Sequence, residues 1–421
     1  MRLLIVGGGA REHALAWKLA QSPEVDELLV APGNAGTAAI ARNLPIAATD
    51  IDALVEVAGR ERVGLTVVGP EEPLARGLAD RLRARGLLVF GPDAAAARIE
   101  SSKSWAKDVM RAAGVPTAAA REFSALEPAL DWVADAPLPL VVKANGLAAG
   151  KGVVVAATRG EAERAVRAML AERSFGEAGS EILIEECLSG PEVSVLALTD
   201  GETIYPLVPA TDYKRAGAGD TGPNTGGMGA FAPVPAVTPE LAACIRAEIL
   251  EPTLSELRER GIAYRGVLYA GLMLTESGPR VIEFNCRFGD PETEVVLPLL
   301  ADDLLPLLLA AAEGRLADVP PPRRHDGACV GVVLASAGYP GSYTTGCPIS
   351  GLDDLPQGVL AFHAGTAWLD GRIVTSGGRV LTLVARGTNL AEARQCVYEG
   401  IARVSYTGKQ FRPDIAEPRT L

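Results

Sequence analysis

The stretch 283-EFNCRFGDPE-292 holds a carboxylate, an amide and a guanidinium at alternate positions. If it forms a strand, the side chains of Glu283, Asn285 and Arg287 point to one face. Carboxylate and amide oxygens suit Mg²⁺ when waters and phosphate oxygens complete its shell, and arginine binds phosphate through two hydrogen bonds. A structural salt bridge is the alternative, but three polar groups on an otherwise apolar strand are costly to bury without a purpose. The stretch therefore predicts a site for a metal and a phosphate.

A second candidate is the glycine-rich stretch 143-KANGLAAGKG-152. It is not a Walker A loop, because Asn145 takes the place of the first glycine and Gly152 that of the Ser or Thr. The β-branched run VVVAA follows, which predicts a strand rather than a helix. We expect a loop between two strands whose glycine N–H groups meet a phosphate, with Lys143 and Lys151 adding charge. An ordinary hairpin is the alternative.

Two further stretches combine charge with turn residues. In 185-EECLSGPE-192 carboxylates flank an apolar residue after a predicted strand, a pattern that taken alone is more often a surface strand end than a nucleotide site. The stretch 212-DYKRAGAGDTGPNTGGMGA-230 has six glycines in nineteen residues. It is expected to be either a disordered surface loop or a lid that orders over a ligand.

The amino end, 7-GGGAREH-13, ends an apolar run and opens a helical pattern. The free N–H groups and the dipole of a helix start predict an anion site. A dinucleotide fingerprint is the rival, but it needs a glycine where Glu12 stands, and no ribose-binding acid ends the second predicted strand. His13 is expected either to contact a substrate or to cap the helix.

These stretches must be positioned by regular elements. Residues 1 to 100 alternate short apolar runs with helical patterns such as 74–86, which predicts a parallel sheet with ligands at the carboxyl ends of its strands. Residues 101–116 form a helical pattern with a Ser cap and a Gly stop. From 138 onward, β-branched runs, helices at 160–172 and 238–261 and a hairpin at 267–285 follow. A Pro-rich linker at 319–324 precedes a small α+β unit at 328–421.

Composition excludes several classes of protein. The net charge of −12 argues against nucleic acid or an anionic membrane as the main partner. Six scattered cysteines without a C-x-x-C pair make a zinc site or a disulfide framework improbable and suit a reducing cytoplasm. The apolar start is too short for a signal peptide, and Asp302 and Asp303 interrupt the most apolar late stretch, so we expect no membrane span.

The motifs together resemble a known family. A helix lysine, a strand lysine, a glycine loop, an E-x-x-L-x-x-x-E hinge and a terminal E-x-N-x-R strand are similar to those of ATP-grasp ligases. The motifs 220-DTGPNTGGMGA-230, 282-IEFNCRFGDPE-292, 30-VAPGNAGT-37 and 361-AFHAGT-366 extend the resemblance over nearly the whole chain, to the phosphoribosylamine–glycine ligase family of purine biosynthesis.

The resemblance implies α/β and α+β architecture in three domains. Residues 1–100 are expected to form an amino-terminal open parallel α/β sheet that binds the phosphoribosyl substrate. Residues 101–318 would form a two-lobed ATP-grasp core, in which 121–190 is a flexible nucleotide lid lobe. Residues 325–421 would form a small carboxy-terminal α+β domain.

The resemblance also implies a reaction and its ligands. ATP would phosphorylate glycine to glycyl phosphate, and the amine of 5-phosphoribosylamine would displace phosphate to give glycinamide ribonucleotide. The cofactors would be ATP and Mg²⁺, with Mn²⁺ as an alternative metal. The partners would be these small molecules and, transiently, the preceding enzyme of the pathway. No nucleophile on the enzyme is needed, and no G-x-S-x-G is present.

Site residues carried over from the resemblance fall into four groups. The ATP group would be Lys103, Lys143, Gly146, Gly150, Lys151, Gly152, Glu185, Glu186, Cys187, Leu188 and Glu192. The phosphoribosylamine group would be Gly8, Gly9, Arg11, His13, Pro32, Gly33, Asn34, Thr37, Glu71 and Gly226. Glycine and its acyl phosphate would meet Asp212, Lys214, Arg287 and Asp290. Glu283 and Asn285 would hold the metal, since Gly271 stands where many ATP-grasp enzymes have a third metal carboxylate.

Three positions depart from the commoner family pattern: Tyr213 for histidine, Ala10 for glycine and Asn145 for aspartate. We expect them to tune the activity rather than abolish it. Three alternatives stay open at this point. They are another ATP-grasp ligase with a different carboxylate and amine, a nucleotide-binding regulator without catalysis, and a dehydrogenase.

Overall fold

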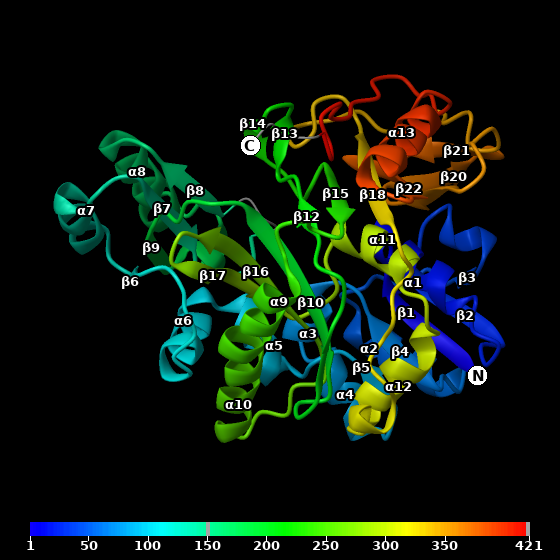
Figure 1. Ribbon diagram of the computed structural model, residues 1–421, viewed down its shortest axis with the longest axis horizontal. Helices are drawn as coiled ribbons and strands as arrows, with labels where there is room; N and C mark the ends of the chain where they lie inside the picture. Colours follow the sequence, from blue (N-terminus) through cyan, green and yellow to red (C-terminus); the bar gives the residue numbers. More distant parts are fainter. Residues whose placement is uncertain (149–151, 418–421) are drawn as a thin grey trace.

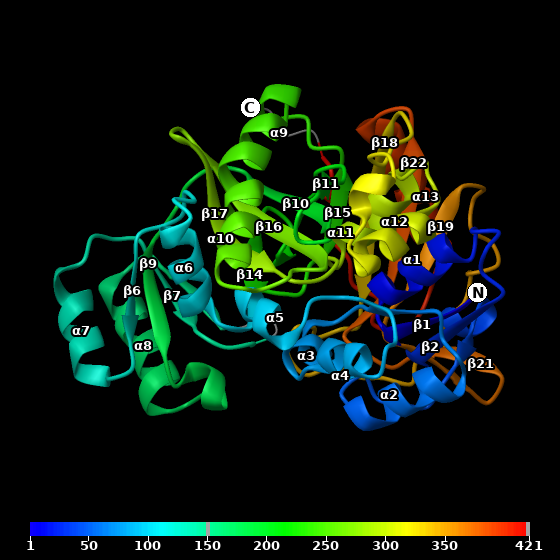
Figure 2. The ribbon, with the colours of Figure 1, turned by 90° about the horizontal axis from the view of Figure 1, so that it is seen from below.

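The computed structural model describes residues 1–148 and 152–417. Figure 1 and Figure 2 show a blue amino-terminal region and a red carboxy-terminal region lying side by side, with a central green sheet next to them. A smaller lobe, built from residues 120–186, projects away from the rest in both views. The mixed α/β and α+β architecture expected from the sequence is confirmed.

The amino-terminal sheet is parallel throughout, in the order β3-β2-β1-β4-β5. Its core strands are buried on both faces, as their continuous apolar runs predict. Helices cover it, and the expected helix over 74–86 is divided because Gly77 adopts a left-handed conformation with φ +81°. The elements are β1 (Arg2–Gly7), α1 (Ala10–Leu19), β2 (Glu27–Pro32), a 3-10 turn (Thr37–Ala39), β3 (Arg42–Asn43), α2 (Ile51–Arg60), β4 (Leu65–Val68), α3 (Glu71–Ala75), α4 (Leu78–Ala84) and β5 (Val89–Phe90).

Two helices lead from this sheet to the projecting lobe: α5 (Ala94–Ser101) and α6 (Lys103–Ala112). The hydroxyl of Ser102 accepts a hydrogen bond from the N–H of Trp105 and so caps α6. Gly114, with φ +67°, follows the end of the helix. The Ser cap and the Gly stop expected from the sequence are both present.

The projecting lobe, called here the lid lobe, is a four-stranded antiparallel sheet in the order β6-β9-β7-β8. Helices α7 and α8 cover it, and their buried residues share one apolar core with the sheet. The elements are β6 (Ala120–Phe123), α7 (Leu126–Asp135), β7 (Leu140–Ala144), β8 (Val153–Ala156), α8 (Arg159–Val166), a π-helical turn (Arg167–Ala171), a 3-10 turn (Gly176–Gly179) and β9 (Ile182–Glu186).

The central sheet has the order β11-β10-β16-β17 and is also antiparallel. Apolar side chains of α9 and α10 pack on it, and Thr238 caps α9 with Pro239 as its first residue, as expected. The elements are β10 (Glu192–Thr199), β11 (Ile204–Pro206), α9 (Pro239–Ile245), a π-helical turn (Arg246–Leu250), α10 (Glu251–Glu259), β16 (Gly266–Thr275) and β17 (Gly278–Asn285).

The carboxy-terminal sheet has the order β12-β15-β18-β22-β19, so it includes two strands from residues 211–232. The glycine-rich stretch is thus folded into strands and is not a disordered loop. The elements are β12 (Thr211–Asp212), β13 (Arg215–Gly217), β14 (Thr221–Asn224), β15 (Gly229–Ala232), α11 (Glu292–Val296), a 3-10 turn (Leu297–Leu299), α12 (Leu304–Glu313), a 3-10 turn (Leu316–Asp318), β18 (Ala328–Ala335), β19 (Val359–His363), β20 (Thr366–Leu369), β21 (Arg372–Thr375), β22 (Arg379–Gly387) and α13 (Leu390–Ile401).

Within the described residues, no helix is long and apolar enough to cross a membrane.

Candidate active site

Four basic side chains converge on the carboxylate of Glu283, near the end of β17. Lys103 begins α6, Lys143 lies on β7, Lys214 follows β12 and Arg287 follows β17. Burial would raise the pKa of Glu283, but the positive charges of these four groups outweigh it and hold the pKa below its usual value. Glu283 is therefore ionised at neutral pH, among basic groups of the kind that bind phosphates.

Lys143 is fully enclosed between the lid lobe and the central sheet. Its Nζ lies 2.7 Å from Oε2 of Glu185 on β9 and donates to the carbonyl oxygen of Ile282 on β17 at 3.1 Å. The other oxygen of Glu185 lies 3.2 Å from Nζ of Lys107. The carboxylate of Glu185 is thus held between two lysines.

The sequence reasoning did not single out Lys107. It lies four residues after Lys103 on α6, and this spacing puts two residues on one face of a helix, which was the available signal. Its Nζ also donates to the hydroxyl of Thr117 and to the carbonyl oxygen of Ala118, at 2.8 and 2.9 Å. These bonds fix the base of β6 to the helix that carries Lys103.

The glycine-rich loop joins β7 and β8 as an antiparallel pair, which confirms that it is not a P-loop. Gly150 and Lys151 lie outside the described residues. The carbonyl oxygen of Gly146 accepts from Nζ of Lys103 at 3.1 Å, and that of Gly152 accepts from the N–H of Ala144 at 2.8 Å. Burial lowers the pKa of Lys103, while the charge of Glu283 opposes this shift.

The Asn145 departure has a structural reason. Its Oδ1 accepts from the N–H of Ser104 at 2.9 Å, and its Nδ2 donates to Oε2 of Glu181 at 2.9 Å. An aspartate could accept the first bond, but it could not donate the second, and it would place its charge against Glu181. Asn145 therefore fits the carboxylate that this chain has at position 181.

The segment after β9 leads from the lid lobe into the central sheet. The carboxylate of Glu186 accepts from the N–H of Ala119 and from Arg280, both at 2.9 Å. Sγ of Cys187 lies against the carbonyl oxygen of Leu188, and burial raises the pKa of this thiol. Glu192 begins β10 and forms an ion pair with Lys214. The side chain of Glu186 thus binds the base of β6 and Arg280, whereas that of Glu192 binds Lys214, one of the basic groups around Glu283.

Glu283 and Asn285 supply two hard oxygen donors from alternate positions of β17. The carboxylate is ionised, and the amide oxygen of Asn285 faces the site, where it accepts from Nη2 of Arg287 at 3.2 Å. Gly271 pairs with Glu283 across the sheet, and no group of three His, Cys, Asp or Glu side chains suited to a metal occurs in the described part of the chain. The donor set fits a divalent cation that takes its remaining ligands from phosphate and water.

Arg287 lies just beyond the end of β17 rather than within it. It forms ion pairs with Glu71 at 3.3 Å and with Glu100 at 2.9 Å. The sequence reasoning did not identify Glu100, which lies on α5 and accepts from the N–H of Cys286 at 2.8 Å. Burial raises the pKa of Glu100 although Arg287 opposes the shift. These bonds connect the central sheet to the amino-terminal sheet.

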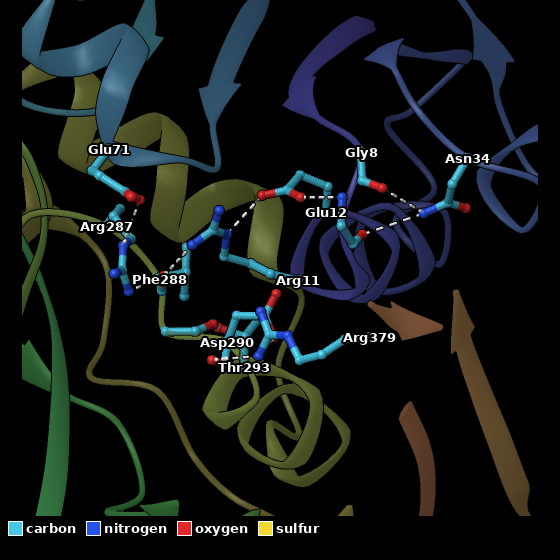
Figure 3. Close-up of polar contacts among 12 residues, drawn as sticks. Gly8, Arg11, Glu12, Asn34, Glu71, Arg287, Phe288, Asp290, Thr293 and Arg379 are labelled. Atoms are coloured by element: carbon cyan, nitrogen blue, oxygen red, sulfur yellow. Dashed lines mark hydrogen bonds and ion pairs between the residues drawn. The ribbon is translucent and has the colours of Figure 1, made fainter. Parts of the chain in front are cut away.

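The amino-terminal loops lie next to this point (Figure 3). The side-chain nitrogen of Asn34 donates to the carbonyl oxygens of Gly8 and His363, at 3.0 and 2.6 Å. Gly8 is needed here, because a Cβ on it would lie 2.7 Å from the carbonyl oxygen of Gly33. Thr37, fully buried, donates to Asn43 and accepts from the N–H of Asn34. Pro32 is exposed at the end of β2.

The helix start at Gly9 is occupied in part by a side chain. Oε2 of Glu12 accepts from the N–H of Gly9 at 2.6 Å, and Oε1 pairs with Nε of Arg11 (Figure 3). Glu12 thus takes one of the N–H groups that the sequence reasoning assigned to an anion. Nη1 of the same Arg11 side chain donates to the carbonyl oxygen of Phe288 at 3.2 Å.

His13 does not cap α1, whose N-cap is Gly9. Its Nδ1 accepts from the N–H of His363 at 2.9 Å, and its ring meets Phe362 edge-on. It is therefore part of the buried contact between α1 and β19. This contact lies 350 residues apart in the sequence, so no local pattern could have revealed it.

Asp212 and Lys214 interact electrostatically with each other, and Asp290 lies next to Arg379. Burial raises the pKa of Asp212 to about 7, against the charge of Lys214 and with help from Glu292. The negative charges of Asp212 and Glu192 raise the pKa of Lys214 well above its usual value. Asp290 pairs with Arg379 at 3.0 Å, and Arg379 also donates to the carbonyl oxygen of Gly226.

Comparison with known proteins agrees with this geometry. Models of phosphoribosylglycinamide synthetase match the chain in three parts: the N domain at residues 1–100, the ATP-grasp (A) domain at 101–293 and the C domain at 329–418. The phosphoribosylamine–glycine ligase of a Nostoc species is 51% identical over 420 residues, which cover 99% of both chains.

Solved structures give the same result. The phosphoribosylamine–glycine ligase of Thermotoga maritima superposes with a TM-score of 0.86 at 36% identity, covering 99% of this chain and 100% of its own. The biotin carboxylase domain of the 2-oxoglutarate carboxylase of Hydrogenobacter thermophilus, solved with MgADP and bicarbonate, has a TM-score of 0.71 at 17% identity. It covers 97% of this chain and 91% of its own, and this likeness concerns the fold alone.

Proposed function

The chain belongs to the phosphoribosylamine–glycine ligase family, and from this we propose how its residues join glycine to 5-phosphoribosylamine with the cleavage of ATP to ADP and phosphate. The chain is an enzyme, an ATP-dependent ligase with an ATP-grasp domain. The observation that carries the proposal is the convergence of Lys103, Lys143, Lys214 and Arg287 on Glu283, where the lid lobe, the central sheet and the amino-terminal sheet meet.

ATP binds between the lid lobe and the central sheet in this proposal. Lys103 and Lys143 hold its phosphates, and the loop with Gly146, Gly150, Lys151 and Gly152 lies over them. Glu185 and the backbone from Glu186 to Leu188 meet the adenine, and Glu192 binds the ribose hydroxyls. Lys143 pairs with Glu185 and Glu192 pairs with Lys214, so charged partners already orient both side chains.

A divalent metal, Mg²⁺ or Mn²⁺, would be held by Glu283 and Asn285. Bound there, it would offset the charge of the phosphates and of the transferring phosphoryl group. Hard oxygen donors favour Mg²⁺ and Mn²⁺ over softer metals. Arg287 stands beside these donors and steadies the transferring group.

The reaction proceeds through an acyl phosphate because a free carboxylate has no good leaving group. An oxygen of the glycine carboxylate attacks the γ-phosphorus, and ADP leaves. The nitrogen of 5-phosphoribosylamine then attacks the carbonyl carbon, loses a proton and displaces phosphate, which carries away one oxygen of the original carboxylate. Asp212 and Asp290 bind the ammonium group of glycine, and Lys214 stabilises the oxyanions.

The second substrate binds at the carboxyl ends of the amino-terminal strands. Gly8, Gly9 and Gly33 allow close approach of a phosphate to the backbone, and Arg11 supplies charge. The same substrate is also contacted by Pro32, Asn34, Thr37, Glu71 and Gly226. The ion pair of Glu71 with Arg287 places this substrate next to the ATP site. The ring of His13 lies against Gly36 of the same loop, and His13 contacts the second substrate in this proposal.

We also propose that the enzyme works in the cytoplasm. Its six cysteines are all free thiols, which suits a reducing compartment. Because 5-phosphoribosylamine is labile, a transient contact with the enzyme that makes it would limit its loss.

The test is ADP release with ATP, Mg²⁺, glycine and 5-phosphoribosylamine formed in situ from ribose 5-phosphate and ammonia, with mass detection of the product. The proposal expects ADP only when both substrates are present, together with glycinamide ribonucleotide. Release with another carboxylate alone would support a different ATP-grasp ligase. Binding of ATP without turnover under any condition would support a non-catalytic regulator.

A further inference from the structure

The carboxy-terminal segment after α13 carries a guanidinium that is almost completely buried. Arg412 is 1% exposed, and its group pairs with Asp414 on its own segment and with Asp220 at 2.8 Å. It also donates to the carbonyl oxygen of Arg215 at 3.1 Å. Asp220 and Arg215 belong to the β13–β14 hairpin, nearly 200 residues earlier in the chain. A buried charge with this many partners fixes the two segments firmly to each other.

The same segment also holds the residue between Asp212 and Lys214. The guanidinium of Arg412 stacks on the ring of Tyr213 at 4.8 Å, and the N–H of Ala416 donates to the Tyr213 hydroxyl at 3.0 Å. The N–H of Tyr213 donates to the carbonyl oxygen of Gly229, the first residue of β15. The carbonyl oxygen of Tyr213 accepts from the N–H of Met228, just before that strand. Tyr213 is therefore held on one side by the sheet and on the other side by the carboxy-terminal segment.

The segment is itself anchored to the carboxy-terminal domain. Arg394 on α13 donates to the carbonyl oxygens of Pro413 and Ile415, at 2.7 and 3.0 Å. The hydroxyl of Tyr398, also on α13, donates to the carbonyl oxygen of Arg412 at 2.6 Å. Figure 1 shows β13 and β14 beside the red end of the chain. A continuous set of contacts thus runs from α13 through Arg412 to Tyr213 and Arg215, the residues on either side of Lys214.

We propose that Arg412 is a positioning residue for the ligase reaction, which holds Asp212 and Lys214 in place through Tyr213 and the β13–β14 hairpin. The inference rests on the proposed function, because it takes Asp212 and Lys214 as the groups that meet glycine and its acyl phosphate. On this proposal, residues 390–417 of the carboxy-terminal domain support the glycine site without contacting a substrate themselves.

The test compares Arg412→Lys with the wild-type enzyme. Lysine keeps the charge but cannot bond Asp220, Asp414 and the carbonyl oxygen of Arg215 together. We expect KM for glycine to rise about tenfold or more, as for the loss of a hydrogen bond to a charged group, while KM for ATP stays within about twofold. Tyr213→Phe, which removes only the hydroxyl that accepts from Ala416, should shift KM for glycine in the same direction by less.

Lys409→Met is the matched control. Lys409 lies on the same segment but donates only to carbonyl oxygens of the carboxy-terminal domain, those of Ile401 and Val404. Its loss should leave KM for glycine unchanged. If KM for glycine rose equally in Lys409→Met, general loosening of the carboxy-terminal domain would explain both rises. That result would overturn the assignment to Arg412.

Amide hydrogen exchange over residues 211–226 gives a second readout that does not depend on activity. Arg412→Lys should speed exchange there, including at Thr225, whose N–H donates to the carbonyl oxygen of Lys214, whereas Lys409→Met should not. Unchanged exchange and unchanged KM for glycine would overturn the inference. Absence of glycine-dependent turnover in the wild type would instead overturn the proposed function, and the exchange data would still decide whether Arg412 holds the segment.

Discussion

At the residue scale, the site is a balance between burial and charge. Glu283 stays ionised because four basic groups surround it, and Arg287 tolerates burial because Glu71 and Glu100 flank it. Burial of one unpaired charge would be far more costly than burial of this network. The network therefore keeps basic side chains charged where phosphates are proposed to bind.

Lys143→Met tests the phosphate contact. The variant keeps the apolar stem but loses the charge, so kcat/KM for ATP should fall by about 10- to 150-fold, the equivalent of about 1.5–3 kcal/mol for a hydrogen bond to a charged group. Lys107→Met is the control, because Lys107 also pairs with Glu185 but is not among the main charges that lower the pKa of Glu283. Equal effects of the two variants on ATP would show that Lys143 acts only by holding Glu185.

Asp212 gives a prediction about pH. Its pKa of about 7 means that the carboxyl is partly protonated at neutral pH. Only the ionised form holds an ammonium group, so kcat/KM for glycine should rise as pH increases through about 7. In Asp212→Asn this limb should disappear and kcat/KM for glycine should be low throughout. An unchanged limb in the variant would assign the titration to another group.

The sequence predicted that three of the candidate residues lie together, but it did not predict their contacts. The E-x-N-x-R spacing led to Glu283, Asn285 and Arg287, because side chains that alternate along a strand share a face. Glu100, Lys107 and Arg412 were missed. Glu100 and Cys286 are 186 residues apart in the sequence, and Arg412 and Arg215 are 197 residues apart. Local patterns carry no information about such pairs.

At the element scale, glycines set how closely the loops approach. The β-branched residues of the lid lobe predicted its strands. They also predicted that the glycine-rich loop joins two strands, which are the antiparallel pair β7 and β8. The division of the helix at Gly77 and the pairing of β15 with β18 were not predicted. A single glycine inside a helical pattern is usually tolerated, and strand pairing over about 100 residues depends on the whole domain.

Gly8→Ala tests the close approach of the amino-terminal loops. The added methyl group would lie 2.7 Å from the carbonyl oxygen of Gly33, so the loop must shift, at a cost of about 1–3 kcal/mol in the free energy of unfolding. KM for 5-phosphoribosylamine should rise, while KM for ATP should change little.

Gly59→Ala is the control for that variant. Gly59 lies within α2, and an added Cβ would meet no atom within 4 Å. This substitution should stabilise the protein by about 0.5–1 kcal/mol, because alanine favours a helix more than glycine does. If Gly8→Ala left both stability and substrate binding unchanged, the structure of these loops would have to be revised.

At the scale of the whole molecule, the three expected domains share elements and contacts. Residues 211–232 lie between two strands of the central sheet in the sequence, yet two of their strands extend the carboxy-terminal sheet. Asn34, His13 and His363 tie the amino-terminal sheet to β19. The candidate site thus combines residues from the amino-terminal, central and carboxy-terminal regions.

The His13–His363 contact predicts acid sensitivity. Burial lowers the pKa of His13 to about 3 and that of His363 to about 4, so both stay neutral in the folded protein at pH values where the unfolded chain is protonated. Their contribution to stability is present above pH 6.5 and is lost as pH falls toward these folded pKa values. Each should lower the free energy of unfolding by about 1.4 kcal/mol per pH unit below about pH 6.

Urea unfolding at about pH 7 and about pH 5 measures this effect. His13→Asn should reduce the difference in stability between the two pH values, even if the variant is less stable at both. His325→Asn is the control, because His325 is exposed and lies elsewhere. An equal pH dependence in wild type and His13→Asn would contradict the account of this contact.

The central claim is that the basic cluster around Glu283 serves phosphoryl transfer to the carboxylate of glycine. Its most direct test uses glycine labelled with ¹⁸O in the carboxylate and follows the label into inorganic phosphate by mass spectrometry during turnover with ATP and 5-phosphoribosylamine. The account predicts one labelled oxygen in each phosphate released. Phosphate without the label, formed together with glycinamide ribonucleotide, would show that no acyl phosphate forms and would contradict the mechanism.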